Sequence, residues 1–296
     1  MDETFVRTDP LMDLKSYPHW LQEIVQECSD GRRGVAEHEL FRLMCEGSLS
    51  QRATRRFLVG VWPVIEQFPQ YMAMNLLKVQ YGTAPGHEMG RKYLIRNIRV
   101  EQNHVEYWID WAQAHGISRD ELLFGWRSGS IDALSHWCWH TCERDPLPAA
   151  MAATNYAIEG VTGEWSALVC SSAAYENSFA IDVRKKAMKW LRVHAQYDDT
   201  HPWEALEIIA TIIGNRATPR EVQGIRAGIR RSYEYMRMAF DDCLASNETK
   251  DWVAPVVSND AGSEQRIQSS SGVGNPSGMQ TLMNFSPYSV SQHVSD

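Results

Sequence analysis

Apolar residues recur at intervals of three and four from about Leu14 to Leu244. This spacing places them on one face of an α-helix. The chain has no sustained period-two run of β-branched residues, which a strand would favour. The pattern therefore predicts an all-α fold with about seven to nine helices. The clearest segments are 36–46, 51–80, 87–115, 131–143, 146–172, 183–199, 203–213 and 220–244.

Residues at the ends of these segments support the boundaries. Ser50 precedes one helix, and Asp145 followed by Pro146 supplies a cap and a first-turn proline for another. Gly82, Gly116 and Gly214 stand where helices are expected to stop.

The composition changes after about Ser246, where Ser, Gly, Asn and Gln predominate. Such a segment cannot bury much apolar surface. No internal repeat is evident. We therefore expect one helical domain over residues 1–245 and a disordered tail over 246–296.

The chain has 296 residues, of which 44% are hydrophobic and 22% charged, as in ordinary globular proteins. Its net charge of -8 disfavours nucleic acid and anionic lipid as partners. The first residues lack the features of a secretory signal, and no apolar run approaches the ~20 residues that span a bilayer. The six cysteines form no Cys-x-x-Cys pair. These features predict a cytoplasmic protein with reduced thiols and no membrane insertion.

Glu66 is the first residue that suggests chemistry. Its neighbours at helical spacing are Val59, Trp62, Pro69 and Ala73, so its face of the helix is apolar. A carboxylate there needs a cationic partner, a proton or a metal ion. The alternative is a carboxylate hydrogen-bonded inside the core.

Glu101 and His104 are three residues apart and therefore share a helical face, beside the apolar Ile98, Val105 and Trp108. A Glu-x-x-His pair that points into a helical bundle is a ligand pair of diiron carboxylate proteins. The same spacing also occurs in solvated surface pairs, which is the alternative here.

His194, Asp198 and His201 follow one another at steps of four and three, which keeps them on one stripe of a single helix. Two imidazoles and a carboxylate on one stripe favour a bound cation. Because Pro202 follows directly, the alternative is a solvated, hydrogen-bonded helix end.

Glu159 is a fourth candidate carboxylate. Small residues, among them Ala152 and Gly163, share its helical face and leave room for either a ligand or a neighbouring helix. By itself Glu159 is equally compatible with a hydrogen-bond acceptor in the core.

Together these positions supply four carboxylates and three imidazoles on four helices, about the number that two irons require. One shared metal centre would explain all the buried charges at once. Zinc fits less well, because structural zinc sites are rich in Cys. Glu204 and Glu207 are expected to orient an imidazole. The candidate metal ligands are Glu66, Glu101, His104, Glu159, His194, Asp198 and His201.

Several stretches resemble the heme-oxygenase-like diiron oxidases, and within them the fatty-acid decarboxylases that form undecene. The resemblance extends over about residues 2–244. It is carried by WPVIEQF at 62–68, RNIRVE at 96–101, SHWCWH at 135–140, NYAIEG at 155–160 and HAQYDD at 194–199. Two departures are the Ser-rich tail and Asn97, where many relatives have Glu.

The resemblance implies a single-domain, seven-helix, TenA-like bundle that binds two Fe(II) and uses O2 as co-substrate. A hydrogen would be removed from C3 of a medium-chain fatty acid such as dodecanoate, and loss of CO2 would leave a terminal alkene, 1-undecene. The ligand roles fall on the seven candidates above, with Glu101, Asp198 and Glu159 as the catalytic carboxylates.

Other readings of the same fold stay open. The alternatives are a diiron oxidase acting on an amino acid or amine, and a metal-free TenA-like enzyme. An external electron donor and a second copy of the chain, as a homodimer, are compatible partners.

Overall fold

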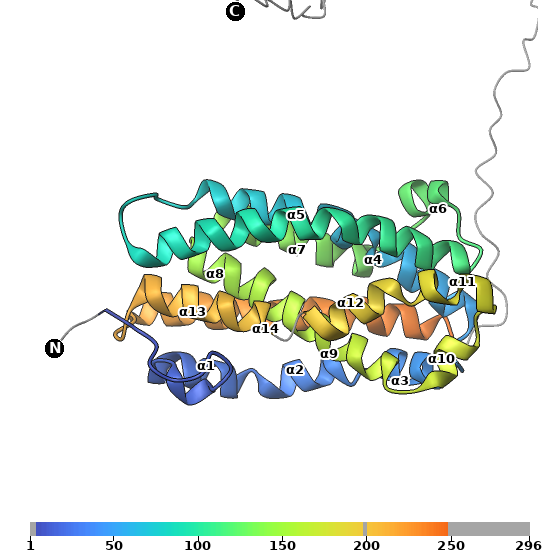
Figure 1. The fold of residues 1–296 in the computed structure, drawn as a ribbon, viewed down its shortest axis with the longest axis horizontal. Coiled ribbons are helices and arrows are strands. Elements are labelled where there is room, and N and C mark those ends of the chain that lie inside the picture. Colours follow the sequence, from blue (N-terminus) through green and yellow to red (C-terminus); the bar gives the residue numbers. More distant parts are fainter. Residues whose placement is uncertain (1–3, 198–199, 248–296) are drawn as a thin grey trace, which may run out of the picture. The chain divides into compact units, whose positions relative to one another are not determined.

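Four long helices form the framework of the fold. The computed structural model describes residues 4–197 and 200–247. Within this part, α4 packs against both α5 and α7, and α14 packs against α7. Figure 1 shows these helices lying with their axes roughly aligned. Their bounds are α4 (Gln51–Leu77), α5 (Pro85–Ala114), α7 (Gly129–Arg144) and α14 (Pro219–Ala245).

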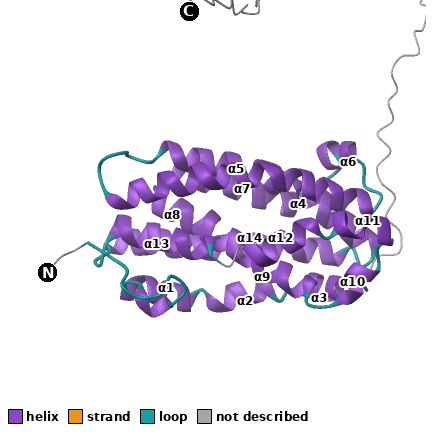
Figure 2. Ribbon diagram, in the orientation of Figure 1, coloured by secondary structure: helices purple, strands orange, loops and turns teal. Residues whose placement is uncertain are grey.

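Shorter helices complete the described part, in which no residue forms a strand (Figure 2). The predicted all-α class is therefore confirmed. The shorter helices are η1 (Leu14–Ser16), α1 (His19–Glu27), α2 (Ser29–Ala36), α3 (Glu39–Cys45), α6 (Arg119–Phe124), α8 (Leu147–Met151), η2 (Ala152–Ile158), α9 (Glu159–Cys170), α10 (Ala173–Asn177), α11 (Ile181–Ala187), α12 (Lys189–Tyr197) and α13 (His201–Ile213).

Local side chains define several helix ends, as the sequence predicts. The hydroxyl of Ser50 accepts the N–H of Ala53 at 3.2 Å, which satisfies one free donor at the start of α4. Gly116 and Gly214 follow α5 and α13 with φ of 72° and 85°, a left-handed conformation that favours glycine.

Two helical segments differ from the predicted ones. The segment expected over 183–199 is divided at Met188 into α11 and α12. The segment expected over 146–172 is one continuous helical run, but its middle part, η2, has π-helical hydrogen bonding. A π-helical turn widens the helix locally and is frequent at functional sites.

The core is rich in aromatic side chains. Trp108, Trp111, Trp190, Phe41 and Phe57 are almost completely buried, and the ring centroids of Trp108 and Trp190 are 4.8 Å apart. Such edge-to-face packing adds to the free energy gained by burying the rings.

The predicted tail, apart from its first two residues, lies outside the described residues. Among the helices that are described, none is long and apolar enough to cross a bilayer.

Candidate metal centre

Three buried side chains from two helices meet between α5 and α12. Glu101 and His104 come from α5 and His194 from α12. One ligand atom from each lies within 4.8 Å of the other two, and all three residues are buried. The predicted Glu-x-x-His pair therefore points into the bundle. The third side chain, His194, comes from a helix that is far away in the sequence.

The contact between Glu101 and His104 favours a cation. Nδ1 of His104 is 2.8 Å from Oε2 of Glu101, both side chains are more than 90% buried, and no aligned hydrogen bond from a described residue satisfies Nδ1. An ionised carboxylate oxygen can only accept, so a proton or a metal ion is needed between the two atoms. One carboxylate with two imidazoles is a donor set that iron accepts, so these residues fit a metal ion.

The orientation of His194 is fixed by the backbone. Its Nδ1 is 2.8 Å from the carbonyl oxygen of Trp190, and a carbonyl only accepts, so Nδ1 carries the hydrogen. Burial, with a smaller contribution from His104, holds the pKa of His194 well below its usual value. A neutral imidazole with Nδ1–H has its lone pair on Nε2, as a metal ligand requires.

Buried Glu159 and partly buried His201 form a second pair beside this group. Nδ1 of His201 is 3.0 Å from Oε1 of Glu159. Burial is the largest cause that raises the pKa of Glu159, and the charge of Glu101 raises it further. The hydrogen bond from His201 lowers this pKa but does not cancel the increase. Burial alone would lower the pKa of His201, but the hydrogen bond and charge of Glu159 reverse this and raise it. A proton is therefore held between these two side chains.

Two neutral side chains support Glu159. The hydroxyl of Tyr93 donates to its Oε2 at 3.4 Å, and the amide of Asn155 donates to the same oxygen at 3.3 Å. Asn155 lies in the π-helical segment η2, four residues before Glu159. From the sequence, Asn155 can be identified only as a residue on the same helical face as Glu159. Tyr93 cannot be identified from the sequence as a partner of Glu159, because it lies on another helix.

A glycine lets α13 approach this site. A Cβ atom at Gly160 would lie 3.0 Å from Cγ of Pro202, which is tighter than ordinary contact. The absence of a side chain at Gly160 therefore allows the first residues of α13, including His201, to reach Glu159 on α9.

Not every predicted ligand joins the group. The prediction that His194 and His201 share one helical stripe is wrong, since α12 ends at Tyr197 and His201 begins α13. Asp198 lies outside the described residues. Glu66 is only partly buried on α4, and it is not in the group of ligand atoms within 4.8 Å of one another in the described part.

Glu204 and Glu207, which the sequence predicts to orient an imidazole, each pair with an arginine in the described part. Glu204 forms an ion pair with Arg96, and Glu207 accepts from Arg7 at 3.0 Å. The imidazole of His201 is oriented by its hydrogen bond with Glu159, and the imidazole of His194 by its hydrogen bond with the backbone carbonyl of Trp190.

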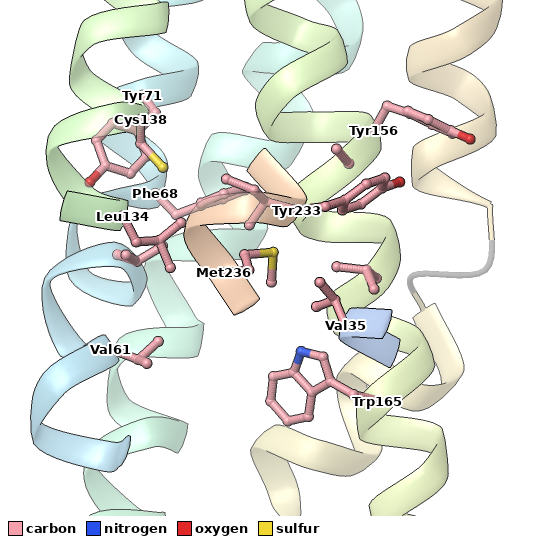
Figure 3. Close-up of a cluster of buried hydrophobic side chains, with 14 of the residues drawn as sticks. Val35, Val61, Phe68, Tyr71, Leu134, Cys138, Tyr156, Trp165, Tyr233 and Met236 are labelled. Atoms are coloured by element: carbon pink, nitrogen blue, oxygen red, sulfur yellow. The ribbon is translucent and has the colours of Figure 1, made fainter. Parts of the chain in front are cut away.

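The buried polar groups open onto a cavity with an empty volume of about 550 Å³. Its polar lining consists of Glu101, Glu159, His104, His194 and Thr162. Apart from these, the described lining is apolar: Val61, Val64, Ile65, Phe68, Leu134, Ile158, Trp165, Trp190, Met236 and Phe240. Figure 3 shows part of this wall, with Phe68, Leu134 and Met236 gathered between the helices. The cavity therefore combines a polar end with an apolar wall.

Comparisons with known proteins agree with this geometry. Residues 55–236 match the model of a family described as iron-containing redox enzymes. A crystal structure of a TenA homologue from Pseudomonas syringae is 50% identical, covers 82% of this chain and 99% of its own, and has a TM-score of 0.80. A domain with a heme oxygenase-like fold from Shewanella denitrificans is 13% identical, covers 75% and 91%, and has a TM-score of 0.60.

One curated relative has a named activity. It is a 4-aminobenzoate synthase from Chlamydia pneumoniae, 20% identical over 209 residues, which cover 69% of this chain and 88% of the relative. The matched family and the solved structures share the heme-oxygenase-like, TenA-like helical fold with this chain.

Proposed function

This chain belongs to the family of iron-containing redox enzymes, and we propose that it uses O2 to decarboxylate a medium-chain fatty acid to a terminal alkene and CO2. The observation that carries the proposal is the cavity in which Glu101, His104, His194 and Glu159 form one polar end, while the rest of the described lining is apolar except for Thr162. An amphiphilic substrate with one polar head matches such a lining.

The proposed iron ligands fall into two sets. Glu101, His104 and His194 would hold one iron, because their ligand atoms already lie within 4.8 Å of one another. Glu159 and His201 would hold the second, with the expected ligands Asp198 and Glu66 completing the two Fe(II) sites. When bound, the irons supply the activation of O2 and the oxidising power for the reaction.

The cavity would orient the fatty acid. Its carboxylate would lie at the polar end, and its alkyl chain would lie against Val61, Phe68, Leu134 and Met236. Each buried CH2 contributes about 0.8 kcal/mol to binding, so the wall favours an alkyl chain over a polar substrate.

The protein also controls protons and water at this end. The proton shared between Nδ1 of His201 and Oε1 of Glu159 is available within the site. Tyr93 and Asn155 keep the Glu159 carboxylate in one orientation. The apolar wall excludes water from the reacting part of the substrate.

A second candidate has one observation in its favour. The similarity to a 4-aminobenzoate synthase supports a diiron oxidase of the same fold that acts on an amino acid or amine. Against it, the described lining beyond the polar end is apolar, which favours an alkyl chain over the polar groups of an amino acid. A metal-free TenA-like enzyme would need a proton in place of the metal ion at the contact between His104 and Glu101.

The test is an anaerobic Fe(II) titration of the purified protein, followed by O2 with and without dodecanoate. We expect two irons per chain, with 1-undecene in the headspace and CO2 in equal amount. Iron binding with product from an amine or amino acid, and none from dodecanoate, would favour the second candidate. Activity that survives complete chelation would favour the metal-free enzyme.

A further inference from the structure

A line of aromatic rings leads away from the candidate metal centre. The imidazole of His194 stacks on Trp190 with ring centroids 3.7 Å apart. Trp190 in turn stacks on Trp111, with centroids 5.7 Å apart and planes 24° apart. Trp108 contacts both indoles at 4.8 and 5.0 Å. The π systems from His194 to Trp111 are therefore in continuous contact.

The line continues through hydrogen bonds. The indole N–H of Trp111 donates to the hydroxyl oxygen of Tyr175 at 2.8 Å. The Tyr175 oxygen is also 2.8 Å from Nε2 of His115. Because the indole can only donate, the hydroxyl hydrogen is directed to His115. Burial lowers the pKa of His115 to about 4, so its imidazole is neutral at pH 7 and can accept that hydrogen.

The outer end of the line reaches a second hollow. Tyr175 and His115 help to line a depression with an empty volume of about 900 Å³, between the ends of α4 and α5 and the segment 175–183. The remaining lining includes Thr54, Ser178 and Val183. A small molecule in this hollow would contact Tyr175 without entering the cavity beside His194.

The electron balance of the proposed reaction requires an external electron donor. Removing two hydrogens and CO2 from a fatty acid releases two electrons and two protons. Reducing O2 to two waters consumes four of each. Two electrons per turnover must therefore come from an external reductant, and two protons from that reductant or from solvent.

We propose that Trp190, Trp111 and Tyr175 form the route by which electrons from a donor in this hollow reach the metal centre beside His194. The proposal rests on the iron site of the proposed function. When the centre takes an electron from Trp190, Trp111 restores Trp190, and Tyr175 restores Trp111. As Tyr175 loses its electron, its proton moves to Nε2 of His115. The donor's electron and the returning proton then regenerate Tyr175.

The test uses the iron-loaded full chain, oxidised and then made anaerobic. Reduced methyl viologen serves as the donor, and the formation of Fe(II) is followed by rapid mixing without any fatty acid. We expect Trp111→Phe and Tyr175→Phe each to slow iron reduction by about tenfold or more, equivalent to ~1.4 kcal/mol in the barrier. Trp190 is left intact, because it contacts His194.

Trp137→Phe is the matched control. Trp137 is a buried tryptophan whose indole N–H also makes a side-chain hydrogen bond, to Ser232 at 2.9 Å, and its ring packs against His140, Tyr235 and Arg231. This variant should reduce its iron at the wild-type rate. Thermal unfolding and iron content establish that each variant is folded and loaded.

A second readout does not depend on reduction of the iron by a donor. After the Fe(II)-loaded protein reacts with O2 without substrate, peptide mass spectrometry should find oxidised side chains at Trp111 and Tyr175. Tyr175→Phe should shift this oxidation to Trp111.

Loaded, folded Trp111→Phe and Tyr175→Phe proteins with wild-type reduction rates would overturn the route and leave the proposed function intact. A wild-type protein that binds no iron would overturn both. Iron that is reduced along this route in a protein that makes no alkene would support the route and refute the decarboxylase.

Discussion

His201 and Glu159 are 42 positions apart in the sequence, yet Nδ1 of one is 3.0 Å from Oε1 of the other. This contact joins the first residue of α13 to the first residue of α9, directly after the π-helical segment. The site is thus assembled at helix ends and at an irregular helix. Its properties depend on the residues that hold these ends in place.

Asn155→Ala is expected to weaken Fe(II) binding by about tenfold, because Asn155 orients the Glu159 carboxylate and losses of this kind typically cost 10- to 100-fold. Isothermal titration with Fe(II) under anaerobic conditions measures the effect. Asn75→Ala is the control, since Asn75 is also fully buried but accepts from Lys78 instead. Equal Fe(II) affinities in the two variants would mean that Asn155 has only a structural role.

His194→Ala is expected to lower the affinity for Fe(II) by more than about tenfold, because it removes a proposed ligand itself rather than a supporting residue. Iron analysis of the anaerobically loaded protein gives the number of ions retained. His140→Ala, at an exposed imidazole on α7, should retain the wild-type iron content. Full iron content in the His194 variant would remove His194 from the ligand set.

Leu134→Ala is expected to increase the preference for tetradecanoate over dodecanoate, because it lengthens or widens the apolar wall of the cavity. Removing a buried leucine side chain also costs about 2–5 kcal/mol of stability. Leu122→Ala supplies the control, since Leu122 is fully buried outside the cavity lining. The ratio of the two alkenes in the headspace should change only in the Leu134 variant. An unchanged ratio in that variant would show that this part of the wall does not select the chain length of the fatty acid.

Stability is expected to fall as the pH drops from about 7 to 5, in part through His115. Its folded-state pKa of about 4 is below the unfolded value of about 6.5, so the unfolded state binds more protons in this range. The contribution of His115 is therefore complete above the unfolded pKa and decreases as the pH falls toward the folded one. It amounts to about 2 kcal/mol between pH 7 and 5.

Urea unfolding of wild-type and His115→Gln proteins at both pH values isolates this contribution, because the other titrating groups are common to both. The glutamine can still accept a hydrogen bond from Tyr175. A loss of stability of the same size in both proteins would show that His115 does not titrate differently in the folded and unfolded states.

The sequence by itself determined the helical class and several side chains of the site. Apolar spacing identifies the long helices because each must bury one face, and this signal is local. Glu101 and His104 could be paired for the same reason, since a spacing of three on a regular helix fixes their common face. Capping at Ser50 and the stop at Gly214 are equally local.

Tertiary structure alone decided how these pieces meet. The spacing of His194 and His201 suggested one helix, but α12 and α13 are separate, and His201 meets Glu159 because Gly160 lets α13 approach closely. Tyr93 reaches the same carboxylate from α5. Contacts between residues far apart in the chain depend on helix packing, and no periodicity along a single segment encodes them.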